Sequence, residues 1–175
     1  MMGKILAVFL LASGVIAGVA MYYLQVYHFY ENVPATGAGD VQLTAMASGA
    51  PEPLPHDNFQ AIDADSSPIR YRACFTTTAR PEELTETYTP YPDAEPLNAP
   101  FWFDCFDAEA IGEALEGGRA RAFLGQADIQ YGIDRIVAIT EDGRGYVWHQ
   151  INRCGAVVFD GQPAPDDCPE PPEGY

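Results

Sequence analysis

The stretch ILAVFLLASGVIAGVAMYYLQVYHFY, residues 5–30, decides how the rest of the chain is organised. Its first part, residues 5–26, carries no charged side chain. An α-helix rises about 1.5 Å per residue, so these residues as a helix cover roughly the 30 Å thickness of a bilayer's hydrocarbon layer. The sequence therefore predicts a transmembrane anchor over residues 1–30.

The charges around this stretch predict its direction across the membrane. Lys4 is the only charged side chain before it, and the next basic residue is Arg70. Because basic residues stay on the cytoplasmic side, we expect the N-terminus in the cytoplasm and the C-terminal domain in the periplasm, across the inner membrane. The small residues 18–20 leave open a cleaved signal peptide. The aromatic residues within 22–30 are typical of the headgroup level and favour an uncleaved signal-anchor.

The chain has four cysteines, and all of them follow the apolar stretch: Cys74, Cys105, Cys154 and Cys168. An even number of cysteines in an oxidising compartment predicts two disulfide bonds. Three connectivities are possible. Closure between sequence neighbours favours Cys74 with Cys105 and Cys154 with Cys168.

The charge balance restricts the class of partner. The chain has 25 acidic and 9 basic residues, a net charge of −16. Such a surface repels nucleic acid and anionic lipid headgroups, so neither is an expected partner. Two interpretations stay open: the charge attracts a partner with a basic surface, or it only keeps an exported protein soluble.

Composition predicts four parts. Residues 1–30 are the anchor, and residues 31–57, rich in Ala, Gly, Thr and Pro without a sustained period, are predicted as a flexible linker. Residues 58–161 are predicted as an α+β envelope domain. Residues 162–175 hold five prolines and four acidic residues, which predicts a proline-rich acidic tail.

Two hairpins are predicted within the domain. In the first, Asp63 lies opposite Arg72, so that opposite charges share one face and apolar residues the other. In the second, a four-residue turn at residues 141–144, with Asp142-Gly143 at its centre, places Val137 opposite Trp148. The predicted registers give each sheet face a consistent character.

A short helix is predicted between the hairpins. Asp107 is a suitable N-cap, and apolar residues recur at helical spacing until Gly117 and Gly118 end the pattern. The predicted fold class is therefore α+β: an N-terminal transmembrane helix, then a small antiparallel sheet with one short helix, stapled by disulfides.

The segment 80–100 carries five prolines and five acidic residues. A loop of this length in a compact domain is usually functional or disordered. It carries Tyr88 and Tyr91 and leads to Trp102, and aromatic side chains on constrained loops make interface anchors. We therefore predict these three residues as a partner-binding surface, with the alternative that Trp102 is a residue of a core strand.

The sequence contains none of the common catalytic or metal-binding motifs, namely HExxH, CxxC, GxSxG, a P-loop or GxGxxG. We therefore predict no catalytic residue, no metal ligand set and no cofactor. One alternative is an envelope enzyme or metal-binding domain that uses His149 and nearby carboxylates such as Asp134. A cysteine such as Cys154, in a disulfide, would be no nucleophile there.

Four stretches together resemble an uncharacterised family of single-pass membrane-anchored proteins of alphaproteobacteria: residues 22–27, 71–75, 101–107 and 142–150. The resemblance implies no activity and no functional residues. The expected function is an accessory or protein-interaction domain without catalysis of its own, bound to the membrane by its N-terminal helix and to another envelope or membrane protein. A purely structural envelope protein is the remaining alternative.

Overall fold

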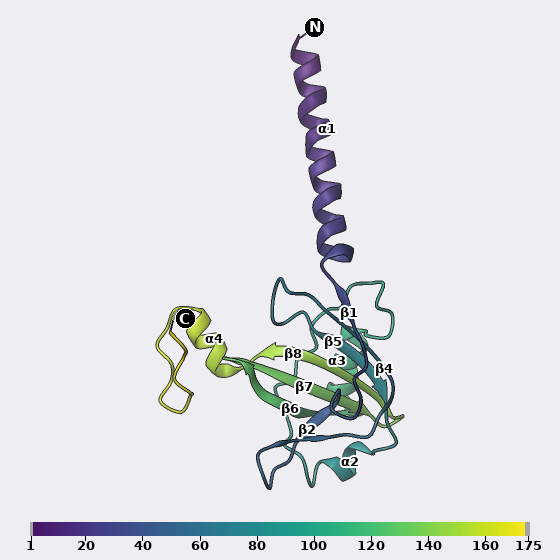
Figure 1. Ribbon diagram of the computed structural model, residues 1–175, viewed down its shortest axis with the longest axis vertical. Helices are drawn as coiled ribbons and strands as arrows, with labels where there is room; N and C mark the ends of the chain where they lie inside the picture. Colours follow the sequence, from purple (N-terminus) through teal and green to yellow (C-terminus); the bar gives the residue numbers. More distant parts are fainter. Residues whose placement is uncertain (1, 174–175) are drawn as a thin grey trace.

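The computed structural model describes residues 2–173, as a long N-terminal helix that leads into a folded domain (Figure 1). Residue 1 of the predicted anchor and residues 174–175 of the predicted tail lie outside the described residues. Helix α1 (Met2–Tyr23) continues into a π-helical segment, η1 (Leu24–His28). Together Gly3–His28 make a helix of 26 residues that is long and apolar enough to cross a membrane. Its most apolar window is not buried in the domain, and among Gly3–His28 only Leu24 and Val26 are part-buried.

The domain is built on one antiparallel sheet in the order β1-β4-β5-β8-β7-β6. Its strands are β1 (Glu31–Val33), β4 (Asp57–Asp63), β5 (Arg72–Thr76), β6 (Ala120–Gln130), β7 (Ile133–Thr140) and β8 (Arg144–Ile151). A second sheet pairs β2 (Gln42–Thr44) with β3 (Pro51–Pro53). Three short helices complete the domain: α2 (Pro81–Leu84), α3 (Ala108–Glu116) and α4 (Arg153–Phe159). The predicted α+β fold class is confirmed.

The sheet has a hydrophobic core on each face. Successive side chains of a strand point to opposite faces, and β7 supplies Val137 to one core and Ile136 to the other. The first core is closed by residues around β2 and β3, including Leu43, which is fully buried. The second is closed by Phe106 and by Ile111 of α3. The central strands are therefore apolar on both sides.

Helix α3 forms as its sequence predicts. The Asp107 side chain caps it, because its Oδ1 accepts a hydrogen bond from the backbone N–H of Ala110 at 3.1 Å. Gly118 follows the helix with a φ of 71°, which a residue without Cβ adopts readily. The predicted cap and stop are both confirmed.

The prediction of a flexible linker over residues 31–57 is wrong. This segment contains β1, β2 and β3, and Val41, Leu43 and Leu54 from it are at most 3% exposed in the first core. The Asp40 carboxylate accepts hydrogen bonds from the backbone N–H groups of Thr36 and Gly37, which fixes the turn before β2. Its strands are only three residues long, too short for a period to show in the sequence.

Both predicted hairpins exist, but each register differs by one residue from the prediction. Ile62, not Asp63, lies opposite Arg72. Val137 lies opposite Val147, and Trp148 lies opposite Ile136. A glycine with a φ of 81°, residue 143, closes the second hairpin as a three-residue turn, shorter than the predicted turn. Since a shift of one residue exchanges the faces of a strand, Arg72 lies on an apolar face.

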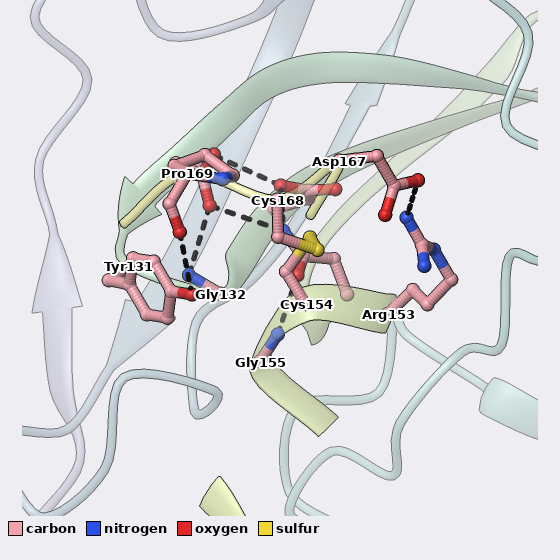
Figure 2. Close-up of a disulfide and its surroundings, with 11 residues drawn as sticks. Tyr131, Gly132, Arg153, Cys154, Gly155, Asp167, Cys168 and Pro169 are labelled. Atoms are coloured by element: carbon pink, nitrogen blue, oxygen red, sulfur yellow. Dashed lines mark hydrogen bonds and ion pairs between the residues drawn. A yellow bond between two sulfur atoms is a disulfide. The ribbon is translucent and has the colours of Figure 1, made fainter. Parts of the chain in front are cut away.

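The structure pairs the cysteines as sequence-local closure favours. Cys74 is bonded to Cys105, with their Cα atoms 6.2 Å apart, and this bond joins β5 to the segment before α3. Cys154 is bonded to Cys168 and joins α4 to the tail (Figure 2). The tail is held further by an ion pair from Arg153 to Asp167. Its described part is therefore fixed on the domain.

Helix α4 approaches the β6–β7 turn through two glycines, both labelled in Figure 2. A Cβ on Gly155 would lie 2.3 Å from the carbonyl oxygen of Gly132, and Gly132 has a φ of 74°. Asn152 caps the helix, because its Oδ1 accepts a hydrogen bond from the Gly155 N–H at 2.9 Å. The contact is one of backbone against backbone, so neither position has room for a side chain.

We predict that Gly155→Ala lowers the free energy of unfolding by roughly 1 to 3 kcal/mol, the usual cost of overpacking a rigid contact. Urea unfolding of the full chain in detergent micelles, followed by tryptophan fluorescence, measures the loss. The matched control is Gly112→Ala in α3, where a Cβ meets nothing within 4 Å. There the same change should stabilise by up to about 1 kcal/mol. Equal behaviour of the two variants would contradict the backbone contact.

Candidate partner-binding groove

The proline-rich loop, residues 80–100, is attached near its middle to the edge strand β6. The backbone N–H of Tyr91 donates to the carbonyl oxygen of Ala122, and that of Leu124 donates to Thr89, both at 2.9 Å. Tyr88 forms a single bridge with Ala45, just after β2. This part of the loop is thus a continuation of the sheet, without being a regular strand.

Two side chains from the sheet hold the second half. Gln150, near the end of β8, donates from Nε2 to the Asp93 carbonyl at 2.7 Å and accepts at Oε1 from the Glu95 N–H at 2.8 Å. Arg72 donates from Nε to the Leu97 carbonyl at 2.7 Å and from Nη2 to the Asn98 carbonyl at 3.0 Å. The loop is therefore held in one conformation from both ends.

Arg72 is an unusual support because it is only 3% exposed. Burial lowers the pKa of its guanidinium to about 10, so the group stays charged at neutral pH. Among the described residues no carboxylate forms an ion pair with it. Backbone carbonyls and the ring of Phe106, 5.7 Å from Cζ to centroid, surround the charge instead.

Between the loop and α3 lies a groove of about 640 Å³, here called the acidic groove. Its walls are residues of 90–96 from the loop and of 108–116 from α3, and its floor is 120–122 of β6. The charged residues among those that line it are Glu95, Glu109, Glu113, Glu116 and Arg121. All five side chains are exposed. The lining thus carries four carboxylates and one guanidinium, so the groove presents a negative field to a ligand.

The structure brings one of the three predicted partner-binding residues into this groove. Tyr91 lines it, and its hydroxyl donates to Asp134 Oδ2 at 3.2 Å. Burial, together with this carboxylate, raises the pKa of the Tyr91 hydroxyl. Tyr88 is half-buried against the first core, outside the groove. Trp102 lies against the end of the N-terminal helix, where its Nε1 donates to the Val26 carbonyl at 2.7 Å.

The sequence reasoning missed the contribution of α3. Glu109, Glu113 and Glu116 are spaced by four and three residues, which places them on one face of a helix. That spacing was visible in the sequence. What the sequence did not show is that this face lies opposite the proline-rich loop, because the pairing depends on the tertiary contacts of the loop.

His149 lies away from the groove and has both ring nitrogens engaged. Nδ1 is 2.8 Å from the Pro68 carbonyl, and Nε2 is 3.1 Å from Nε of Arg135. A carbonyl only accepts and an arginine only donates, so the ring is neutral with its proton on Nδ1. The ring also stacks on Tyr71, with centroids 4.7 Å apart. His149 thus has no free nitrogen for a ligand.

The carboxylate that sequence analysis placed near His149 belongs to a different network. Residues 134 and 150 are opposite one another in the ladder, next to the pair of 135 and 149, so their side chains point to the other face. Asp134 Oδ1 accepts hydrogen bonds from the Asp128 N–H and from Asn152. Within residues 2–173, no group of three or more His, Cys, Asp or Glu side chains is placed to hold a metal ion.

We predict that His149 makes the domain less stable as the pH falls from about 6.5 to 4. Burial lowers the pKa of folded His149 to about 4 from the ordinary value of 6.5, so the unfolded chain takes up the proton first. Over this window the loss is roughly 3 kcal/mol, at 1.36 kcal/mol per pH unit. Urea unfolding at a series of pH values measures it.

The control for this prediction is the slope of stability against pH, not stability at one pH. His149→Gln keeps a donor and an acceptor without titrating, so its slope over the window should be smaller than that of the wild type. His28→Gln, at an exposed histidine, should keep the wild-type slope. Identical slopes for His149→Gln and the wild type would contradict the assignment.

A family model described as "Family of unknown function (DUF6446)" matches residues 41–169. No curated protein and no solved structure matches the chain. The matched residues begin at Val41, the first buried residue of the segment that was predicted from composition to be a linker. They include both disulfides and the whole acidic groove. The match covers well over half of the 175 residues. The chain therefore belongs to the DUF6446 family, a family of unknown function.

Proposed function

We propose that the chain is a single-pass protein of the inner membrane whose periplasmic domain binds another envelope or membrane protein through the acidic groove. The observation that carries this proposal is the groove itself, a concave surface with four carboxylates and one guanidinium among the charged residues that line it. The domain acts as an accessory or interaction module. Its partner offers a basic, extended segment.

The groove has the properties that peptide recognition requires. Gln150 and Arg72 hold its loop wall before any partner arrives, so little ordering entropy is lost on binding. Prolines of the loop and the ring of Tyr91 provide rigid apolar contact area. The carboxylates of α3 complement lysine or arginine on the partner, which mainly favours fast and selective association.

Charge and cysteine chemistry support the proposed position in the membrane. Lys4 before the N-terminal helix supports a cytoplasmic N-terminus, because basic residues are retained on that side. All four cysteines lie after the helix, and their pairing in two disulfides fits an oxidising compartment. Both observations support a periplasmic domain, and the aromatic residues within 22–30 favour an uncleaved anchor.

We predict that the protein isolated from native membranes has no free thiol. Alkylation in denaturant without a reductant should label none of the four cysteines, and alkylation after reduction should label all of them. Peptide mass spectrometry without reduction should recover Cys74 joined to Cys105 and Cys154 joined to Cys168. Labelled thiols in the unreduced sample would contradict a periplasmic location.

The groove is tested by removing charge from it. We predict that Glu113→Gln with Glu116→Gln weakens recovery of the partner in a pull-down from detergent-solubilised native membranes. A combined loss of about 1.4 kcal/mol from two exposed charge contacts lowers affinity roughly tenfold. The effect should shrink at high salt, since exposed charges are screened.

The matched control removes the same charge elsewhere. Glu82 and Glu86 are exposed acidic residues of the proline-rich loop that do not line the groove. Glu82→Gln with Glu86→Gln should recover the partner as the wild type does. Equal loss in both double variants would assign the effect to overall charge, and recovery of the wild-type protein alone under mild detergent would favour a purely structural role.

A further inference from the structure

The N-terminal helix and the domain are joined almost without a spacer. Segment η1 ends at His28, and β1 begins at Glu31. Strand β1 is paired with β4 and so belongs to the main sheet. If the helix spans the bilayer, the sheet therefore begins within a few residues of the headgroup level.

A set of contacts fixes the helix end against the domain. The indole of Trp102 donates to the Val26 carbonyl at 2.7 Å and stacks on Tyr27, with an interplanar angle of 17°. The edge of Tyr30 meets Trp102 at 5.9 Å between centroids. The guanidinium of Arg70 lies over the ring of Tyr30, 5.6 Å from Cζ to centroid. Helix and domain are thus held in one orientation.

The segment that carries Trp102 is itself rigid. Arg72 binds the carbonyls of Leu97 and Asn98 on one side of it, and the Cys74–Cys105 disulfide holds the other side. The residue next to Trp102 is therefore positioned by the fold. That residue is Phe101, whose side chain is 66% exposed.

Phe101 lies beside the end of the helix. Its ring meets the edge of Tyr27 with centroids 5.8 Å apart. The other exposed aromatic side chains at this end are Tyr22, Tyr23, Tyr27 and Phe29. A lone exposed phenylalanine on a protein surface is ordinary. Here it extends a group of aromatic residues at the level where a spanning helix leaves the hydrocarbon, and aromatic rings are enriched at that level.

We propose that the domain lies on the periplasmic surface of the bilayer and inserts Phe101 into the interface between headgroups and acyl chains, beside the anchor. This inference rests on the proposed membrane span and is independent of the acidic groove. The occupant of the surface is lipid, because the surface continues the apolar helix. It holds no lysine, the guanidinium of Arg70 is engaged over the Tyr30 ring, and acidic Asp104 and Glu31 are close in sequence to the aromatic residues, so insertion needs no anionic lipid.

The test uses the full chain in phosphatidylcholine vesicles whose acyl chains carry bromine near the headgroup, a short-range quencher of tryptophan fluorescence. Phe101→Trp adds a reporter at an exposed position. We expect the added emission to be quenched and shifted to shorter wavelength. The wild type, with Trp102 and the buried Trp148, provides the baseline.

The matched control is Met46→Trp. Met46 is 49% exposed and lies two residues after the end of β2, which lies at the end of the domain away from α1 (Figure 1). Its added emission should stay unquenched. Added phosphatidylglycerol should not increase quenching at position 101. Equal emission from the two added tryptophans, or quenching at 101 that requires phosphatidylglycerol, would overturn the proposal.

A second measurement needs no variant. A phosphatidylcholine analogue with a photoactivated carbene group near the headgroup labels whatever protein lies at that depth. In the wild-type chain we expect more label on the peptide containing residues 99–104 than on the peptide containing residues 42–53. Equal labelling of the two peptides would overturn the proposal, and it would do so whether or not a protein partner is found for the groove.

Discussion

The guanidinium of Arg72 is the interaction on which the rest of the domain depends. It is buried, and its hydrogen bonds go to four backbone carbonyls from two connections, residues 69–71 and 97–98. A buried charge without compensation is costly, so these carbonyls must stay where they are as long as the charge does. One side chain of β5 thereby fixes both the connection before that strand and the proline-rich loop.

This role explains why the loop is ordered despite its composition. Five prolines and many acidic residues predict a segment without a core of its own. It is held by polar contacts instead: Arg72 and Gln150 bind its backbone, and a disulfide closes it at Cys74 and Cys105. The backbone of the loop is thus held in place, and its prolines, Tyr91 and Glu95 line the groove.

Strong local signals in the sequence were enough to predict the helices and hairpins, but not their registers or their packing against one another. The apolar run, the Asp107 cap and the Asp-Gly turn each act within a few residues, and each produced the expected helix or hairpin. The register of a hairpin depends on the length of its turn. Asp63 does not lie opposite Arg72, because Arg72 is buried against loop carbonyls instead. Strands of three residues lack a readable period, so Leu43 was assigned to a linker although it is fully buried.

The groove and the aromatic residues proposed to enter the membrane interface are two ends of one rigid segment. Residues 90–96 line the groove, residues 101–102 contact the helix end, and Arg72 holds residues 97–98 between them. A domain on a flexible linker would sample many heights above a bilayer, whereas this arrangement sets one. We infer that the groove is presented at a fixed distance and angle to the membrane. A partner anchored in the same membrane benefits most from that, because its own segment is confined to the same layer and its effective concentration is high.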